Sequence, residues 1–139
     1  MKLTEAVKKE VLLNEDYQWN NKVILVAEDI ELNFMYINEI LESTGAIIIH
    51  AENGKKAVDI CNSNTKIDLV LMDILMPVLN GYDATRQIKT IRDNLPIIAQ
   101  TAYALTEDRG KAIAAGCDDF IAKPIGKNEL LRKIDRFFK

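Results

Sequence analysis

Three carboxylates and one amine stand directly after apolar runs of the chain, and these groups suit metal-assisted chemistry at phosphorus. The runs and the charged residues that follow them are 23–27 with Glu28 and Asp29, 69–72 with Asp73, and 120–122 with Lys123. If the runs are neighbouring parallel strands, the four charges meet at one edge of a sheet. Clustered carboxylates repel one another unless a cation lies among them, and their oxygen atoms favour Mg²⁺, with Mn²⁺ as an alternative. The pattern predicts a metal site in which one carboxylate can attack phosphorus.

Each of these residues, taken alone, also has an ordinary structural explanation. Glu28 and Asp29 can favour the start of a helix through its dipole, Asp73 can cap a turn, and Lys123 can be a solvated amine. Their shared position at the ends of apolar runs is what favours a site.

Apolar runs alternate with stretches of helical periodicity, and this alternation predicts the fold class. Runs that are apolar throughout are typical of strands covered on both faces. We expect strands near residues 23–27, 46–49, 69–72, 97–99 and 120–122, and helical positions over 30–41, 57–61, 84–91, around 113, and over 130–137. Such a series of strand–helix units predicts an α/β fold, with a single doubly wound five-stranded parallel sheet and five helices.

Residues with special backbone or capping properties agree with these boundaries. Gly45 and Gly116 can end the first and fourth helices in the left-handed conformation. Asn53 and Thr106 can cap the starts of the second and fourth helices. Pro96 can open a strand, where a missing N–H is tolerated.

The first part of the chain differs from the rest. Residues 1–21 combine a loose helical stripe with a polar stretch, and we interpret them as an N-terminal extension or the remnant of an interdomain linker. Residues 22–139 are the predicted domain.

Composition excludes several classes of function. The 139 residues are 48% hydrophobic with a net charge of −3, which fits one compact domain with its own core. The chain lacks the dense run of Lys and Arg that would indicate direct binding to nucleic acid. No apolar stretch has the length of a signal peptide core or a membrane span, and the two cysteines match no metal-ligand spacing. We expect a cytoplasmic setting, without membrane contact by this segment, and no oligomeric state can be inferred.

Four short motifs carry a resemblance to a known family. They are Ala27-Glu28-Asp29; residues 72–77 with Asn80-Gly81; Gln100-Thr101-Ala102; and Ala122-Lys123-Pro124. In this order, at the ends of four expected strands, they resemble the landmarks of response-regulator receiver domains, over residues 22–139. Residues 77–86 and 115–120 are most similar to receivers of hybrid sensor histidine kinases. The resemblance implies the flavodoxin-like receiver fold.

The resemblance implies a role for each charged residue. Asp73 would be the phosphoacceptor, attacking the phosphoryl group of a phosphohistidine. Asp29, Asp73 and the backbone carbonyl of Leu75 would hold Mg²⁺, while Glu28 would act through a metal-bound water and through its charge. Glu28 stands where the family often has aspartate, and it retains the negative charge.

Further residues would read the phosphorylated state. Thr101 and Lys123 would contact phosphoryl oxygens, and Phe120 would be the switch aromatic that moves inward with Thr101. The turn at Pro124 would include a cis Lys123–Pro124 bond. Phosphorylation would reset the face formed by the fourth helix, fifth strand and fifth helix. Gly110 and several alanines predict low local stability in that fourth helix.

Two residues predict the lifetime of the phosphorylated form. Leu75 and Tyr103 should flank the path by which water reaches phosphorus, and neither carries a carboxylate or carboxamide. Without a polar group to orient that water, we expect slow dephosphorylation.

The function implied is that of a phosphoacceptor receiver domain in a two-component phosphorelay, rather than of an enzyme beyond weak self-phosphorylation and autodephosphorylation. The expected partner is a histidine kinase or a histidine phosphotransfer protein. Origin in a hybrid kinase, as the cytoplasmic part of a membrane-bound sensor, is favoured over a single-domain response regulator that acts by protein contact.

Three functions from other classes are disfavoured by particular residues. A magnesium phosphohydrolase with an aspartate nucleophile needs a second acid two residues later, where this chain has Leu75. An FMN carrier needs a phosphate loop rich in hydroxyl groups and glycine after the first strand, where this chain has Glu28 and Asp29, whose negative charge would repel the cofactor. A degenerate receiver that only binds partners would not need the intact set of Asp73, Thr101 and Lys123.

The remaining residues with reactive side chains receive no role. His50 follows an apolar run and is expected near the end of a strand. Because a phosphodonor histidine normally needs exposure on a helix, the phosphodonor must be another protein. Cys61 is expected to pack on the second helix, and Cys117 is expected at the surface of a loop.

Overall fold

The computed structural model describes residues 17–102 and 106–139. Its strands are β1 (Val23–Ala27), β2 (Ile47–Ala51), β3 (Leu69–Asp73), β4 (Ile97–Thr101) and β5 (Asp119–Ala122). Its helices are α2 (Glu31–Glu42), α3 (Gly54–Ser63), α4 (Gly81–Ile91), α5 (Thr106–Ala115) and α6 (Lys127–Phe138). The strands form one parallel sheet in the order β2-β1-β3-β4-β5. The predicted α/β fold is confirmed.

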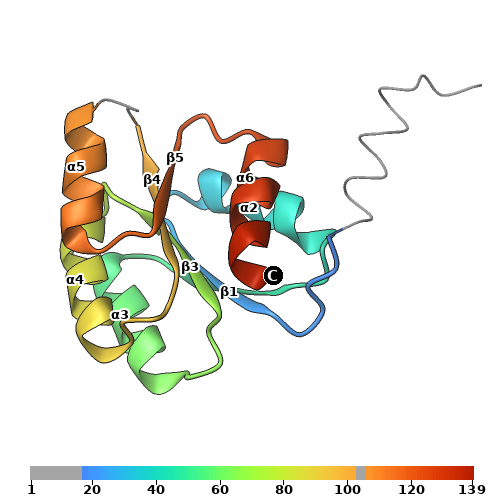
Figure 1. Ribbon diagram of the computed structural model, residues 1–139, viewed down its shortest axis with the longest axis horizontal. Coiled ribbons are helices and arrows are strands. Elements are labelled where there is room, and N and C mark those ends of the chain that lie inside the picture. Colours follow the sequence, from blue (N-terminus) through green and yellow to red (C-terminus); the bar gives the residue numbers. More distant parts are fainter. Residues whose placement is uncertain (1–16, 103–105) are drawn as a thin grey trace, which may run out of the picture.

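The helices cover both faces of the sheet, which explains why the strands are apolar throughout (Figure 1). Helices α3, α4 and α5 lie on one face, and α2 and α6 lie on the other. Side chains alternate between the two faces along each strand. Leu25 packs in the core under α3, α4 and α5, whereas Ile24 and Val26 pack in the core under α2 and α6. Because both cores are apolar, β1, β3 and β4 are buried at every position.

The expected helix ends are largely observed. Gly45 and Gly116 have positive φ angles of 79° and 106°, which a residue with a Cβ atom adopts only with strain. The side chain of Asn53 caps α3 by accepting a hydrogen bond from the backbone N–H of Lys56 at 2.8 Å. Thr106 is the first residue of α5, so the capping position before it lies outside the described residues.

Residues 17–21 pack on the domain. Trp19 is 5% exposed and belongs to the core beneath α2 and α6. Its ring meets Phe138 edge-on at 5.2 Å, and its backbone N–H donates to the carbonyl of Thr44 at 2.7 Å. The domain boundary at residue 22 stays a prediction, but the ordered contacts begin before it.

One predicted surface residue is buried. Cys61 packs in the core as expected, but Cys117 is also buried, which corrects its expected place at the surface of a loop. Beyond Gly116 the chain turns inward: the N–H of Cys117 donates to the carbonyl of Ala112, and its sulfur lies 3.7 Å from the Thr85 hydroxyl. The turn therefore buries the thiol between α4 and α5.

Within residues 17–102 and 106–139, no helix combines the length and the apolar character that a membrane crossing requires.

Candidate functional site

Parallel strands bring the predicted charged residues to one edge of the sheet. Ala27 on β1 is in register with Met72 on β3, so Glu28, which directly follows β1, and Asp73, the last residue of β3, lie level with each other. Asp73 is in register with Gln100 on β4. The strand order therefore places the ends of β1, β3 and β4 side by side.

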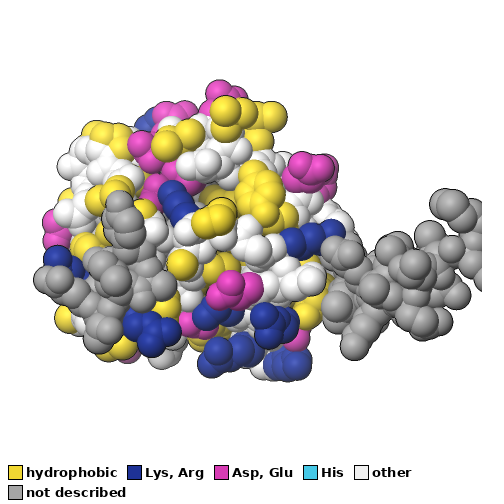
Figure 2. Space-filling model, turned by 90° about the horizontal axis from the view of Figure 1, so that it is seen from above, with side chains coloured by type: hydrophobic (Ala, Val, Ile, Leu, Met, Phe, Trp, Pro, Cys, Tyr) yellow, Lys and Arg dark blue, Asp and Glu magenta, His cyan; other side chains and the backbone are white. Residues whose placement is uncertain are grey.

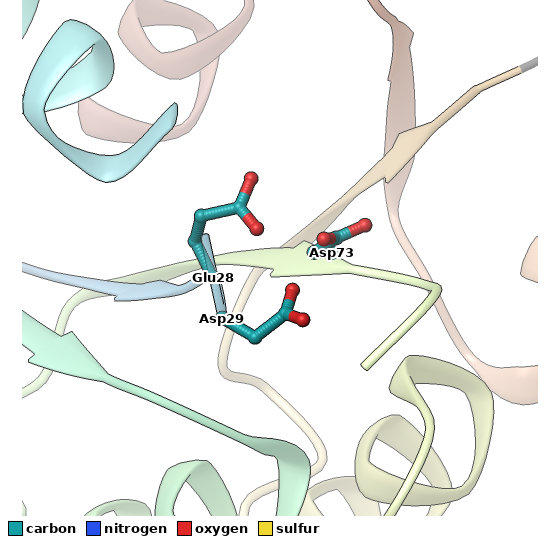
Figure 3. A group of neighbouring side chains, drawn as sticks. All are labelled: Glu28, Asp29 and Asp73. Atoms are coloured by element: carbon teal, nitrogen blue, oxygen red, sulfur yellow. The ribbon is translucent and has the colours of Figure 1, made fainter. Parts of the chain in front are cut away.

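The three carboxylates form one cluster (Figure 3). Glu28, Asp29 and Asp73 each offer an oxygen atom, and these oxygens all lie within 4.8 Å of one another. Glu28 is 0% exposed and Asp73 is 4% exposed, whereas Asp29 is open to solvent. Three hard oxygen ligands at this spacing, with an open side at Asp29, fit a divalent cation such as Mg²⁺.

The amine of Lys123 completes the cluster. Its Nζ atom lies 3.3 Å from a carboxylate oxygen of Glu28 and 3.3 Å from one of Asp73. The backbone N–H of Lys123 donates to the carbonyl of Thr101 at 2.8 Å, and the Lys123–Pro124 bond is cis, as the resemblance implies. One ammonium neutralises one carboxylate, so the cluster retains an excess of negative charge that a cation can balance.

Burial controls the protonation of Glu28. Desolvation raises the pKa of its carboxyl above the usual range, and the adjoining Asp73 carboxyl raises it further through hydrogen bonding and charge. The Lys123 ammonium and the backbone N–H of Ile30 act in the opposite direction. Because proton binding and cation binding both relieve the same repulsion, they compete at this carboxyl.

His50, which the sequence pattern leaves without a role, holds the loop that carries the acids. Its Nε2 atom lies 2.7 Å from the backbone carbonyl of Glu28, to which it donates. Its ring stacks on Phe34 of α2 at 3.8 Å with an interplanar angle of 8°. The backbone N–H of Glu28 also donates to the carbonyl of Ala51 at 3.0 Å. The end of β2 therefore fixes the peptide from which the Asp29 side chain extends.

The segment after β3 passes close to the carboxylates. The N–H of Leu75 donates to Asp73 at 3.3 Å, while the Leu75 side chain is 71% exposed. The N–H of Gly81 donates to the carbonyl of Ile74 at 2.9 Å, and a Cβ atom at Gly81 would overlap the carbonyl oxygen of Asp73. Gly81 is thus needed where α4 begins against the end of β3.

The predicted phosphate-sensing and switch residues lie on the next strands. Thr101 is the last residue of β4 and is 5% exposed. Phe120 on β5 is half-buried, with the Arg109 guanidinium 4.4 Å from its ring centre and the Lys133 amine at 5.4 Å. Tyr103 lies outside the described residues, so its expected position beside the site stays a prediction.

Comparison with known proteins identifies relatives of the chain. The family model for the response regulator receiver domain matches residues 24–135. Hybrid signal transduction histidine kinase I of Dictyostelium discoideum is 39% identical over an alignment of 120 residues, and the match covers 81% of this chain and 7% of that kinase. The polar-differentiation response regulator DivK of Brucella anthropi is 31% identical over 118 residues, which are 84% of this chain and 95% of DivK.

Solved structures show the same fold. The receiver domain of sensor histidine kinase PA1611 from Pseudomonas aeruginosa, solved with a magnesium ion coordinated in its active site cleft, has a TM-score of 0.78 and 38% identity. The match covers 84% of this chain and 97% of that domain. The receiver domain of Saccharomyces cerevisiae Ssk1, solved with the phosphotransfer protein Ypd1, has a TM-score of 0.80 and 28% identity, covering 85% and 89%.

Proposed function

Because the chain belongs to the family of response regulator receiver domains, we propose that it accepts a phosphoryl group on Asp73 from a phosphohistidine of a partner protein. The observation that carries the proposal is the gathering of Glu28, Asp29, Asp73 and Lys123 at one edge of the sheet. A receiver of a two-component system serves as a phosphoacceptor rather than as a dedicated enzyme, so turnover of a small substrate is not expected.

Asp73 is the best placed nucleophile of the three acids. Its carboxylate is oriented from two sides, by the N–H of Leu75 at 3.3 Å and by the Lys123 amine at 3.3 Å. Glu28 is 0% exposed and Asp29 is open to solvent, whereas Asp73, at 4% exposed, combines these two contacts with a small accessible surface. An Asp73 oxygen forms the new P–O bond while the P–N bond breaks, and the imidazole, protonated on its other nitrogen, takes the electron pair and leaves as a neutral ring.

Glu28, Asp29, Asp73 and the backbone carbonyl of Leu75 are the groups that would hold Mg²⁺. When bound, this ion neutralises charge on the carboxylates and on the phosphoryl oxygens. Lys123 contributes a positive charge, and its ion pairs with Glu28 and Asp73 already position this charge at the site. Mn²⁺ remains an alternative from the oxygen ligands alone.

The phosphorylated state would be read through β4 and β5. Thr101 and Lys123 would each contact a phosphoryl oxygen, and their backbones are already joined by a hydrogen bond of 2.8 Å. Phe120, two residues before the end of β5, would respond to movement of Thr101. Helix α5 is the expected moving part of the face that also includes β5 and α6, because its buried side chains include only the small Ala112 and Ala115 among those described.

The partner is proposed to be a histidine kinase or a histidine phosphotransfer protein. Exposed apolar side chains lie near the acids along the chain, just before and on α2 and in the loop after β3: Ile30, Leu32, Met35, Leu75 and Val78. Hydrophobic and acidic side chains are mixed over part of the surface in Figure 2, while Lys and Arg side chains gather elsewhere in that view. An apolar rim beside the phosphoacceptor fits protein contact during transfer.

Origin in a hybrid histidine kinase is favoured by the Dictyostelium relative, of which a receiver-sized segment matches. A single-domain response regulator is the alternative, because this chain matches nearly all of DivK. The cytoplasmic setting stays a prediction.

Phosphorylation tests the proposal directly. The protein is incubated with acetyl phosphate and Mg²⁺, and intact mass spectrometry follows the gain of one phosphoryl group, which peptide mapping should assign to Asp73. Asp73→Asn should abolish the gain. The matched control is Asp59→Asn, which removes an exposed carboxylate paired with Lys55 on α3 and should leave the gain intact. Equal phosphorylation of Asp73→Asn and the wild type would refute the assignment.

A further inference from the structure

Gln100 carries a buried carboxamide that makes no hydrogen bond within the described part of the chain. The residue lies on β4, one position before Thr101, and is 0% exposed. Both Nε2 and Oε1 of its side chain are buried and unpaired among the described residues. An unsatisfied buried polar group costs roughly 1–3 kcal/mol, so a leucine of similar size would be the less costly residue for packing alone.

The position of Gln100 relates it to the acid cluster. It is in register with Asp73 on β3 and with Ile121 on β5, so it lies between the strands that carry the phosphoacceptor and Lys123. Ile98, two residues earlier on β4, packs in the core beneath α2 and α6. Because side chains alternate along a strand, the Gln100 carboxamide extends toward that same face.

A cavity is lined by Gln100 and by two of the charged residues. Its volume is about 130 Å³, and Gln100, Glu28 and Lys123 line it together with apolar side chains that include Ile37 and Ile125. The Tyr36 hydroxyl bridges α2 to the loop before α6 by donating to the carbonyl of Ile125 at 2.6 Å. A water site needs only roughly 10–15 Å³ and two to four polar partners, so this cavity is large enough to hold ordered water. The amide atoms of Gln100 are buried at its wall, so a rotation of the side chain brings them to that water.

We propose that Gln100 is a positioning residue, which holds the Glu28 carboxylate and the Lys123 ammonium through ordered water in this cavity. The chemistry of the groups is complementary, because the amide N–H groups can donate toward the carboxylate and the amide oxygen can accept from the ammonium through a bridging water. Glu28 is then held from the cavity side as well as by the N–H of Ile30. The inference deepens the proposed function and rests on it for its biological meaning.

The decisive variant is Gln100→Leu, which removes both polar atoms at nearly constant volume. A residue that only packs predicts a more stable protein with unchanged Mg²⁺ affinity. A positioning residue predicts stability that is equal or higher, together with Mg²⁺ affinity lowered roughly three- to tenfold, the worth of one ordinary hydrogen bond. Gln100→Asn, which keeps the carboxamide and leaves room for one more water, should recover part of the affinity.

The measurements are urea denaturation of the metal-free protein, calorimetric titration with Mg²⁺, and the initial rate of phosphorylation by acetyl phosphate. The matched control is Gln87→Leu, the same change at an exposed position on α4, which should alter none of them. A crystal structure of the metal-free protein should show ordered water within hydrogen-bond distance of Gln100.

The two proposals fail in different ways. If wild-type Asp73 is never phosphorylated, the proposed function fails, but the Mg²⁺ affinities still test Gln100. If Gln100→Leu stays within about twofold of the wild type in Mg²⁺ affinity and phosphorylation rate, Gln100 is a packing residue and the inference is overturned. The same conclusion follows if the crystal structure shows no water between Gln100 and the charged residues.

Discussion

Asp73→Asn should stabilise the metal-free protein while removing its response to Mg²⁺. At an effective dielectric constant of about 20, two unit charges at 4.8 Å, the upper limit of the separations between the three ligand oxygens, repel by about 3.5 kcal/mol. The attraction between Asp73 and Lys123 at 3.3 Å amounts to about 5 kcal/mol at the same dielectric constant. The two repulsions from Glu28 and Asp29 therefore exceed the attraction by about 2 kcal/mol, and solvent screening at the exposed Asp29 reduces this excess.

We expect the free energy of unfolding to rise by about 1–2 kcal/mol in the variant, which corresponds to an increase in Tm of roughly 3–8 °C. The gain should grow with pH. The pKa of Glu28 is raised in the folded protein, so the folded state binds more protons than the unfolded state between the ordinary value of 4.5 and the raised value. The wild-type protein thus loses stability as pH rises through this window, and the variant, with less repulsion at Glu28, loses less.

Urea denaturation at several pH values, with EDTA and then with excess Mg²⁺, measures both effects. The wild type should gain stability with Mg²⁺ through preferential binding to the folded state, and the variant should gain little. Asp59→Asn is the matched control, because an exposed pair such as Lys55–Asp59 contributes at most about 0.5 kcal/mol. A variant that is less stable than the wild type in EDTA, or that keeps the full Mg²⁺ response, would refute the electrostatic reasoning.

Four further experiments have defined outcomes. Trp19→Ala should lower the free energy of unfolding by about 3–5 kcal/mol, because the ring is 5% exposed, and a loss below about 1 kcal/mol in urea denaturation would contradict its place in the core. Leu75→Asn should shorten the lifetime of phosphorylated Asp73 by supplying a carboxamide that orients water, as measured by loss of the phosphoryl group in Mg²⁺, and an already short wild-type lifetime that the change leaves unaltered would count against this. Burial raises the pKa of the Cys61 thiol to about 11 and also raises that of Cys117, so a thiol reagent at neutral pH should label both only after denaturation, and rapid labelling of the native protein would disprove their burial. His50→Phe should keep the stacking but lose the hydrogen bond to the Glu28 carbonyl, so Mg²⁺ affinity in calorimetry should fall roughly threefold, whereas His50→Gln should recover it in part; equal affinity in all three proteins would rule out a positioning role.

The fold and the location of the candidate site could be predicted from local patterns. Residues 23–27 and 69–72 are apolar throughout, which is typical of strands covered on both faces, and helical periodicity between the runs requires crossover connections. Parallel strands then necessarily share one carboxyl edge. For that reason the sequence alone predicts that Glu28, Asp73 and Lys123 meet, and the ion pairs at 3.3 Å are consistent with this prediction.

Individual side-chain environments could not be predicted in the same way. Cys117 follows a glycine in a loop, a pattern that indicates exposure, yet the turn at Gly116 directs the thiol between two helices. Its burial depends on how closely α4 and α5 approach, which no local pattern contains.

The sequence by itself determined which residues form strands and helices and which charged groups reach the carboxyl edge, because periodicity and strand direction are local properties. Only the tertiary structure decided that Trp19 packs on Phe138, that His50 bonds to the Glu28 carbonyl, and that Gln100 is buried without a partner in the described chain. These side-chain environments are made by residues far apart in the sequence, and they exist only once helices and sheet have packed at particular distances and angles.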